Sequence, residues 1–182
     1  DMLSRMGTIE AAIQYIGGPG SAVVLLCGFF AMVVLERIWA LRHDPAYDNA
    51  DAFCSIGLFF VANVLHLGLV WFIPVAVYVA VFEHFRLVAT MPLWAAIPLA
   101  FLVHEFAYYL DHRLAHRIGL LWAFHAIHHS SNEFNHSTAA RTFFLDGHIK
   151  LALALPAALI GVHPVVYIAV STLADLFGVW NH

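Results

Sequence analysis

The hydrophobic and polar positions divide the chain into long apolar runs separated by short polar segments. The first run covers residues 21–40, and residues 52–72 and 91–110 form two further runs of similar length. A helix of about 20 apolar residues crosses the hydrocarbon core of a bilayer. We therefore predict three membrane-spanning helices over these ranges.

Helix-breaking residues interrupt the remaining apolar sequence at two places. Pro74 interrupts residues 52–82, so we expect a kinked continuation after the second span. Residues 149–180 are apolar on both sides of the breaker at 161–164, and each arm is too short to cross the membrane alone. This pattern predicts a helical hairpin that enters the membrane and returns, which would bring His182 to the side where the third span ends.

The composition indicates that most of the surface faces lipid. Of 182 residues, 62% are hydrophobic and 11% are charged, whereas soluble domains average about 45–50% apolar and about 25% charged residues. Eight Lys+Arg and twelve Asp+Glu are too few to cover a soluble domain of this size. Pattern and composition together predict a single all-α domain over residues 1–182, a polytopic helical bundle in the membrane.

The positions of the basic residues predict the orientation of the bundle. Arg and Lys in short flanks mark the cytoplasmic ends of membrane helices. Arg37 and Arg42 follow the first span, and Arg113 and Arg117 follow the third, which ends on the same side when the crossings are counted. We therefore expect the sequence after residue 110 on the cytoplasmic side. The net charge of −4 and the lack of a basic run argue against nucleic-acid binding.

Five histidines follow the third span in an HxxxH and an HxxHH cluster: His112, His116, His125, His128 and His129. Residues four apart on a helix share a face, so each cluster can direct two imidazoles at one ion. The adjacent pair in the second cluster diverges by about 100° on a helix, which suits two ions better than one. With His182 as a candidate sixth ligand, the set exceeds the three or four ligands of a zinc site. Spacing alone leaves iron, copper, zinc and nickel open.

The run YYLDHRLAH, with LLWAFHAIHHSSNEFNHSTAAR after it, resembles the membrane fatty acid hydroxylase/sterol desaturase superfamily. The similarity is closest to the branch that includes alkylglycerol monooxygenase and many bacterial relatives, so we expect a bacterial inner membrane. It covers roughly residues 31–182 and is most specific from Tyr108 to Arg141. It implies that the five histidines and His182 bind two iron ions in a non-haem di-iron centre. The superfamily continues to a further HxxHH box, so we expect this chain to be a fragment with an incomplete site.

The resemblance also implies a reaction. Members use O₂ and electrons from an external cytochrome or ferredoxin to hydroxylate a C–H bond of a lipid, or to desaturate it when a second hydrogen leaves. The predicted protein is therefore a membrane-bound lipid monooxygenase. Two alternatives stay open, namely a non-catalytic metal- or haem-binding membrane protein and an inactive fragment of the hydroxylase.

Four polar residues are candidates for supporting the ligands. The carboxylates of Asp111 and Glu105 can accept a hydrogen bond from an imidazole N–H, although Asp111 serves equally well as a charge at a helix end. Glu105 lies inside an apolar run, where an unpaired carboxylate is costly, so a partner is expected, and His104 is a candidate for it. Asn135 and Arg141 belong to the matched segment and can orient ligands, orient a lipid headgroup or structure the loop. His136 falls where the superfamily does not reserve a histidine, so we exclude it from the site.

Overall fold

A computed structural model of the protein describes residues 2–44, 46–69, 72–143 and 148–181. The secondary structure of these residues is all helical, as the sequence predicts. Its elements are α1 (Met2–Ile16), α2 (Gly20–His43), α3 (Asn49–Leu69), α4 (Phe72–Phe85), α5 (Leu93–Ala115), α6 (Gly119–His125), the 3₁₀ helices η1 (His128–Ser130) and η2 (Thr138–Ala140), α7 (His148–Leu153), α8 (Leu155–Ile160) and α9 (Pro164–Trp180).

Two of the described helices, α2 and α5, are long and apolar enough to cross a membrane. Helix α2 covers the predicted run 21–40, and α5 begins at Leu93, two residues into the predicted run 91–110, and continues to Ala115. Helices α4 and α9 are apolar but shorter. Large apolar side chains point outward from the bundle, for example Leu35 and Phe53, which are 66% and 74% exposed. Such a surface is expected for helices that face lipid.

Helix α3 begins where a side chain caps it. The carboxylate Oδ1 of Asp48 accepts hydrogen bonds from the backbone N–H groups of Ala50 and Asp51, which otherwise lack a partner in the first turn. Tyr47, in the link from α2, is buried, with the Arg37 guanidinium 5.1 Å from its ring centre. Burial, together with the nearby Glu36 carboxylate, raises the pKa of the Tyr47 phenol, so it stays protonated at neutral pH.

The segment predicted as a hairpin differs from expectation in its first arm. This arm is two short helices, α7 and α8, separated at Ala154. Pro156 has no N–H, and in a continuous helix its ring would clash with the carbonyl of residue 152, which favours a break before it. The chain then turns at Gly161, whose φ is 121°. A Cβ there would lie 2.5 Å from the carbonyl oxygen of Val88, so the turn requires glycine.

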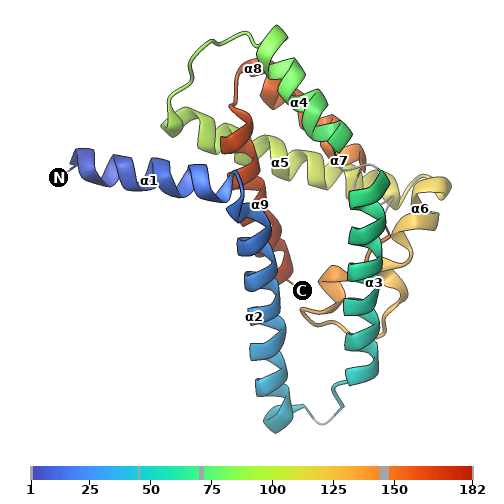
Figure 1. Ribbon diagram of the computed structural model, residues 1–182. Coiled ribbons are helices and arrows are strands. Elements are labelled where there is room, and N and C mark those ends of the chain that lie inside the picture. The colour runs from blue at the N-terminus through green and yellow to red at the C-terminus, as the bar shows by residue number, and fades with distance from the viewer. Residues whose placement is uncertain (1, 45, 70–71, 144–147, 182) are drawn as a thin grey trace.

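The core lies where α5, α8 and α9 pack against each other, and its central residues are small. Ala100, Ala157 and Ala158 are fully buried, and small side chains let helices approach closely. Figure 1 shows α9 crossing α5 and running beside α2, while α3 lies next to the loops around η2. The end of α5, the end of α9 and the start of α3 therefore surround one region, which contains the histidines.

Candidate metal centre

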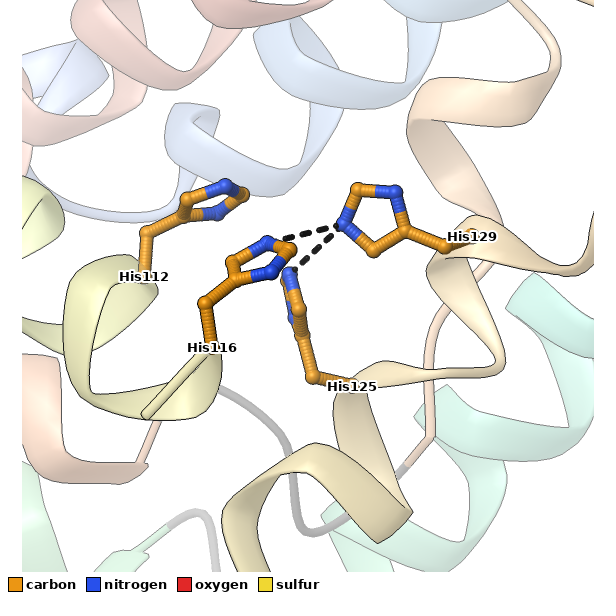
Figure 2. Close-up of side chains that lie close together, drawn as sticks. All are labelled: His112, His116, His125 and His129. Atoms are coloured by element: carbon orange, nitrogen blue, oxygen red, sulfur yellow. Dashed lines mark hydrogen bonds between the residues drawn. The ribbon is translucent and has the colours of Figure 1, made fainter. Parts of the chain in front are cut away.

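Four of the five clustered histidines converge on one point (Figure 2). His112 is in the last turn of α5 and His116 caps it, while His125 ends α6 and His129 lies in η1. One ring nitrogen from each residue lies within 4.8 Å of the others. The Nε2 atom of His129 is 3.1 Å from that of His116 and 3.2 Å from that of His125. The cluster can bind a metal ion.

The two shortest spacings among these nitrogens fit ligands of one ion. Two nitrogens held about 2.0–2.1 Å from a metal lie about 2.9 Å apart at right angles and about 3.3 Å apart at the tetrahedral angle. The two contacts of the His129 Nε2 atom, 3.1 and 3.2 Å, fall in this range. His125 is buried, whereas His116 and His129 are exposed, so the cluster is open on one side. An all-imidazole donor set suits iron, copper, zinc or nickel.

His128 lies beside the four histidines and is held in a defined orientation. Its Nδ1 is 3.1 Å from the carbonyl oxygen of Arg141. Because a carbonyl only accepts, the imidazole proton sits on Nδ1, and Nε2 keeps the lone pair that a metal requires. Its ring centre is 5.4 Å from that of His125, but it is not among the four converging nitrogens. His182 lies outside the described residues.

Arg141 is the hub of a buried hydrogen-bond network around this loop and is 4% exposed. Its guanidinium donates to the hydroxyls of Ser55 and Ser130, each at 3.1 Å. It also donates to Oδ1 of Asp51 at 2.7 Å. The arginine thus joins the first turns of α3 to η1, which carries His128 and His129. Sequence reasoning missed Asp51 and Ser55, whose only signal was a carboxylate at the polar edge of an apolar run.

Asn135 closes a turn in the loop between η1 and η2. Its Oδ1 accepts hydrogen bonds from the Ser137 N–H, the Ser137 hydroxyl and the Thr138 N–H. This geometry corresponds to the loop-structuring interpretation. The neighbouring His136 lies outside the four-histidine cluster, with its Nδ1 3.0 Å from Oε1 of Glu36 on α2. Both residues therefore fix the loop between η1 and η2.

His104, the candidate partner of Glu105, pairs instead with Asp175. His104 is 3% exposed, and its Nε2 lies 3.4 Å from Oδ1 of Asp175 on α9. Adjacent residues on a helix diverge by about 100°, so Glu105 points away from His104 and is exposed. Asp111 accepts a hydrogen bond from the Lys150 backbone N–H at 3.1 Å. Its role toward a ligand imidazole stays a prediction.

A cavity of about 530 Å³ adjoins the cluster, a volume typical of sites for small molecules. Its lining includes His112, His125 and His128, and also His104, Lys150 and Asp175. Much of the remaining wall is apolar, for example Leu25, Phe29, Phe59, Phe177 and Val179. The cavity can hold part of an apolar chain and exposes it to the imidazoles.

Residues 97–182, which contain all of these histidines, match the family described as Fatty acid hydroxylase. The chain belongs to the fatty acid hydroxylase family. The resemblance drawn from the histidine clusters is therefore confirmed. No solved structure shows a significant match to the chain.

This fatty acid hydroxylase family member is similar to curated lipid hydroxylases. It is 33% identical to alkylglycerol monooxygenase from Homo sapiens over 85% of this chain and 35% of that protein. The Xenopus tropicalis alkylglycerol monooxygenase is 32% identical, over 74% of this chain and 32% of that protein. Ornithine lipid hydroxylase OlsE from Rhizobium tropici is 26% identical, over 89% of this chain and 50% of that protein. The chain thus spans about a third to a half of the length of these relatives.

Proposed function

We propose that this chain carries the metal-binding core of an O₂-dependent non-haem di-iron oxidoreductase that hydroxylates a C–H bond of a lipid. Desaturation of the same kind of bond is the variant reaction. The observation that carries the proposal is the cluster of His112, His116, His125 and His129 beside an apolar-walled cavity of about 530 Å³. Membership of the fatty acid hydroxylase family supports a lipid substrate and O₂.

In this proposal the five clustered histidines and His182 hold the two iron ions. Iron supplies the activation of O₂ that no amino-acid side chain provides. The protein orients the imidazoles, and the Arg141 carbonyl keeps the His128 proton on Nδ1 so that Nε2 can bind metal. His125, 6% exposed, forms the dry side of the cluster. The apolar wall excludes water and places a lipid chain against the imidazoles.

The proposal includes a membrane topology. The single all-α domain crosses a bacterial inner membrane several times, and the histidine clusters lie on its cytoplasmic side. Helices α2 and α5 are the described helices with the length and hydropathy for crossing. A cytoplasmic position makes the exposed side of the cluster, at His116 and His129, accessible to an external cytochrome or ferredoxin.

One observation favours a second candidate, a membrane protein that binds a single metal ion without catalysis. The four nitrogens gather at a single point, within 4.8 Å of one another, and the two shortest spacings, 3.1 and 3.2 Å, fit ligands of one ion. Metal stoichiometry separates the two candidates, because the di-iron oxygenase requires two ions and His128 as a ligand.

The deciding experiment uses the full-length protein purified in lipid nanodiscs. We expect two iron ions per chain by mass spectrometry of metals, no haem absorbance, and reductant-dependent O₂ consumption that yields a hydroxylated lipid. A single zinc ion, or a haem absorption band, would overturn the oxygenase. Iron with no oxidised lipid in any tested lipid extract would favour the non-catalytic metal protein.

A further inference from the structure

Four phenylalanine side chains connect α2 to α3. Phe29 and Phe30 follow each other on α2, and Phe59 and Phe60 follow each other on α3. The ring centres of the first residues of the two pairs, Phe29 and Phe59, are 5.5 Å apart, and those of the second residues are 6.2 Å apart. Within each pair the ring centres are 5.1 Å apart on α2 and 5.6 Å apart on α3. All four distances are those of aromatic contacts, about 4.5–7 Å, so the rings form one closed group, the phenylalanine cluster.

The phenylalanine cluster lies between the cavity and the outer surface of the bundle. Phe29, which is 3% exposed, and Phe59 line the cavity. Neighbouring residues on a helix diverge by about 100°, so Phe30 and Phe60 are directed away from it, and Phe60 is 52% exposed on the outer surface. The wall at this place is therefore two rings deep, with one pair of rings at the cavity and the other pair outside it.

Side chains, and not closely packed backbones, close this part of the wall. Helix α2 packs closely on α9, where a Cβ on Gly28 would lie 2.7 Å from a methyl carbon of Leu176. Helix α3 packs on η2 instead. Among the described residues, the backbones of α2 and α3 stay apart over most of their length, with the rings between them (Figure 1). The size of the rings therefore decides how far the cavity extends between the two helices.

The lining of the cavity indicates where an apolar chain lies. His104, Lys150 and Asp175 line it from α5, α7 and α9, whereas Phe29 and Phe59 line it from α2 and α3. Covering polar groups with an apolar chain leaves them without water and is unfavourable. The chain is therefore expected along the apolar wall, with the phenylalanine cluster in its path.

Steric fit, and not burial, decides which chain lengths bind in such a cavity. Lipid tails are about as apolar as leucine side chains, so a methylene group that moves from the bilayer into the cavity gains little. Extra methylene groups in an apolar space that is already filled force the surrounding side chains to shift, which weakens binding about fivefold or more. A closed wall therefore produces an upper limit of chain length.

We propose that the phenylalanine cluster ends the chain-binding part of the cavity and thereby sets the longest lipid chain that the site accepts. A chain of the right length reaches Phe29 and Phe59, and a longer chain collides with their rings. This inference rests on the proposed function, because it takes the cavity to be the lipid site. It concerns the apolar chain and applies to any polar head group.

The test measures binding of the even-numbered saturated primary alcohols from dodecanol to docosanol to the full-length protein, by competition in native mass spectrometry. Their head group is uncharged and identical, so only the chain length varies. We expect the wild-type affinity to fall about fivefold or more from one member of the series to the next, at the length where the chain fills the cavity. An affinity that shows no such limit, or no binding of any alcohol, overturns the proposal.

Two variants at one position should move this limit in opposite directions. Phe59→Ala shortens the wall and should shift the limit to an alcohol at least one member longer. Phe59→Trp enlarges the ring and should shift it to one at least one member shorter. Loss of the fold cannot produce both shifts. The matched control is Phe53→Ala, also on α3, because Phe53 is 74% exposed and lies outside the cluster. The same limit in both Phe59 variants and the wild type overturns the proposal.

The binding assay is independent of oxidation. A length limit that moves with the Phe59 variants, in a protein that forms no hydroxylated product, would contradict the proposed function and leave the role of the cluster in place. Hydroxylated products with the same chain lengths in the wild type and in both variants would contradict the role of the cluster and leave the proposed function in place.

Discussion

The Nδ1 atom of His128 lies 3.1 Å from the carbonyl oxygen of Arg141. The guanidinium of the same arginine donates to Oδ1 of Asp51 at 2.7 Å. One residue therefore connects a predicted metal ligand to the first turn of α3. The orientation of the second histidine cluster depends on how a distant helix packs.

Replacing His125, the buried histidine of the four, tests whether the cluster binds metal. The His125 and His129 Nε2 atoms are 3.2 Å apart, as expected if both bind the same ion. Loss of a residue that only supports a ligand lowers metal affinity about 10–100-fold. Because His125 is a proposed ligand, His125→Ala should lower metal affinity by more than this. Metal content per chain, by mass spectrometry of the purified protein, measures the effect. His136→Ala is the matched control, since His136 pairs with Glu36 outside the cluster. Wild-type metal content in His125→Ala would refute the assignment.

His128 separates a two-ion site from a one-ion site. If it binds the second iron, His128→Ala should lower the iron content from two ions per chain to one while the protein stays in the membrane fraction. If the four converging histidines hold a single ion, the metal content of His128→Ala will equal that of the wild type. The same metal analysis therefore decides between the two candidate functions.

The Asp51–Arg141 pair should contribute to both stability and metal affinity. Asp51→Asn leaves the Arg141 guanidinium buried without its carboxylate, a loss worth about 3–5 kcal/mol for a fully buried pair. The Asp51 side chain is 18% exposed, so we expect about 2–3 kcal/mol, measured by denaturant or thermal unfolding in detergent. Iron should also bind more weakly, because η1 loses its support. Glu10→Gln, an exposed change on α1, serves as the control. Unaltered unfolding in Asp51→Asn would show that the network is dispensable.

Gly161 should tolerate no side chain. Gly161→Ala combines a φ of 121° with a Cβ that would lie 2.5 Å from the Val88 carbonyl oxygen. We expect a loss of stability of at least about 1–3 kcal/mol, the cost of a strained backbone conformation alone. Gly57→Ala is the matched control, because nothing lies within 4 Å of its added Cβ. In helix α3 that change should stabilise by about 0.5–1 kcal/mol. Equal unfolding temperatures for the two variants would contradict this account.

The predicted topology can be tested with a membrane-impermeant maleimide in a variant that lacks the two native cysteines, Cys27 and Cys54. Asn132→Cys, in the loop after η1, should react only in inverted vesicles. Thr90→Cys, in the loop before α5, should react only in right-side-out vesicles. Both positions are exposed, so access to the reagent depends on the side of the membrane. Labelling of both from the same side would contradict a crossing by α5.

Local features of the sequence were enough to predict the helices and some of the residues of the site. The apolar runs predict helices because each backbone must satisfy its own hydrogen bonds in lipid. His112 and His116 share a helical face because they are four residues apart. Residues 97–182, which match the family, contain both histidine motifs.

Helical spacing describes the second cluster, His125, His128 and His129, only in part. It does not lie on one continuous helix, because α6 ends at His125 and His128–Ser130 is a 3₁₀ helix. The rotation per residue there is about 120° instead of about 100°. The sequence pattern therefore predicted the residue types of the cluster, and the backbone decided which imidazole, His129 or His128, joins the other three.

The contacts that complete the site depend on the packing of helices far apart in the sequence. Asp51 and Arg141 are 90 residues apart, and His104 has Asp175 on α9 as its partner in place of its neighbour Glu105. Periodicity tells which face of a helix is polar but not which helix will cover that face. The sequence by itself determined an all-helical, apolar chain with a histidine-rich, metal-type motif. Only the tertiary structure decided which imidazoles meet, which residues orient them and which charges line their cavity.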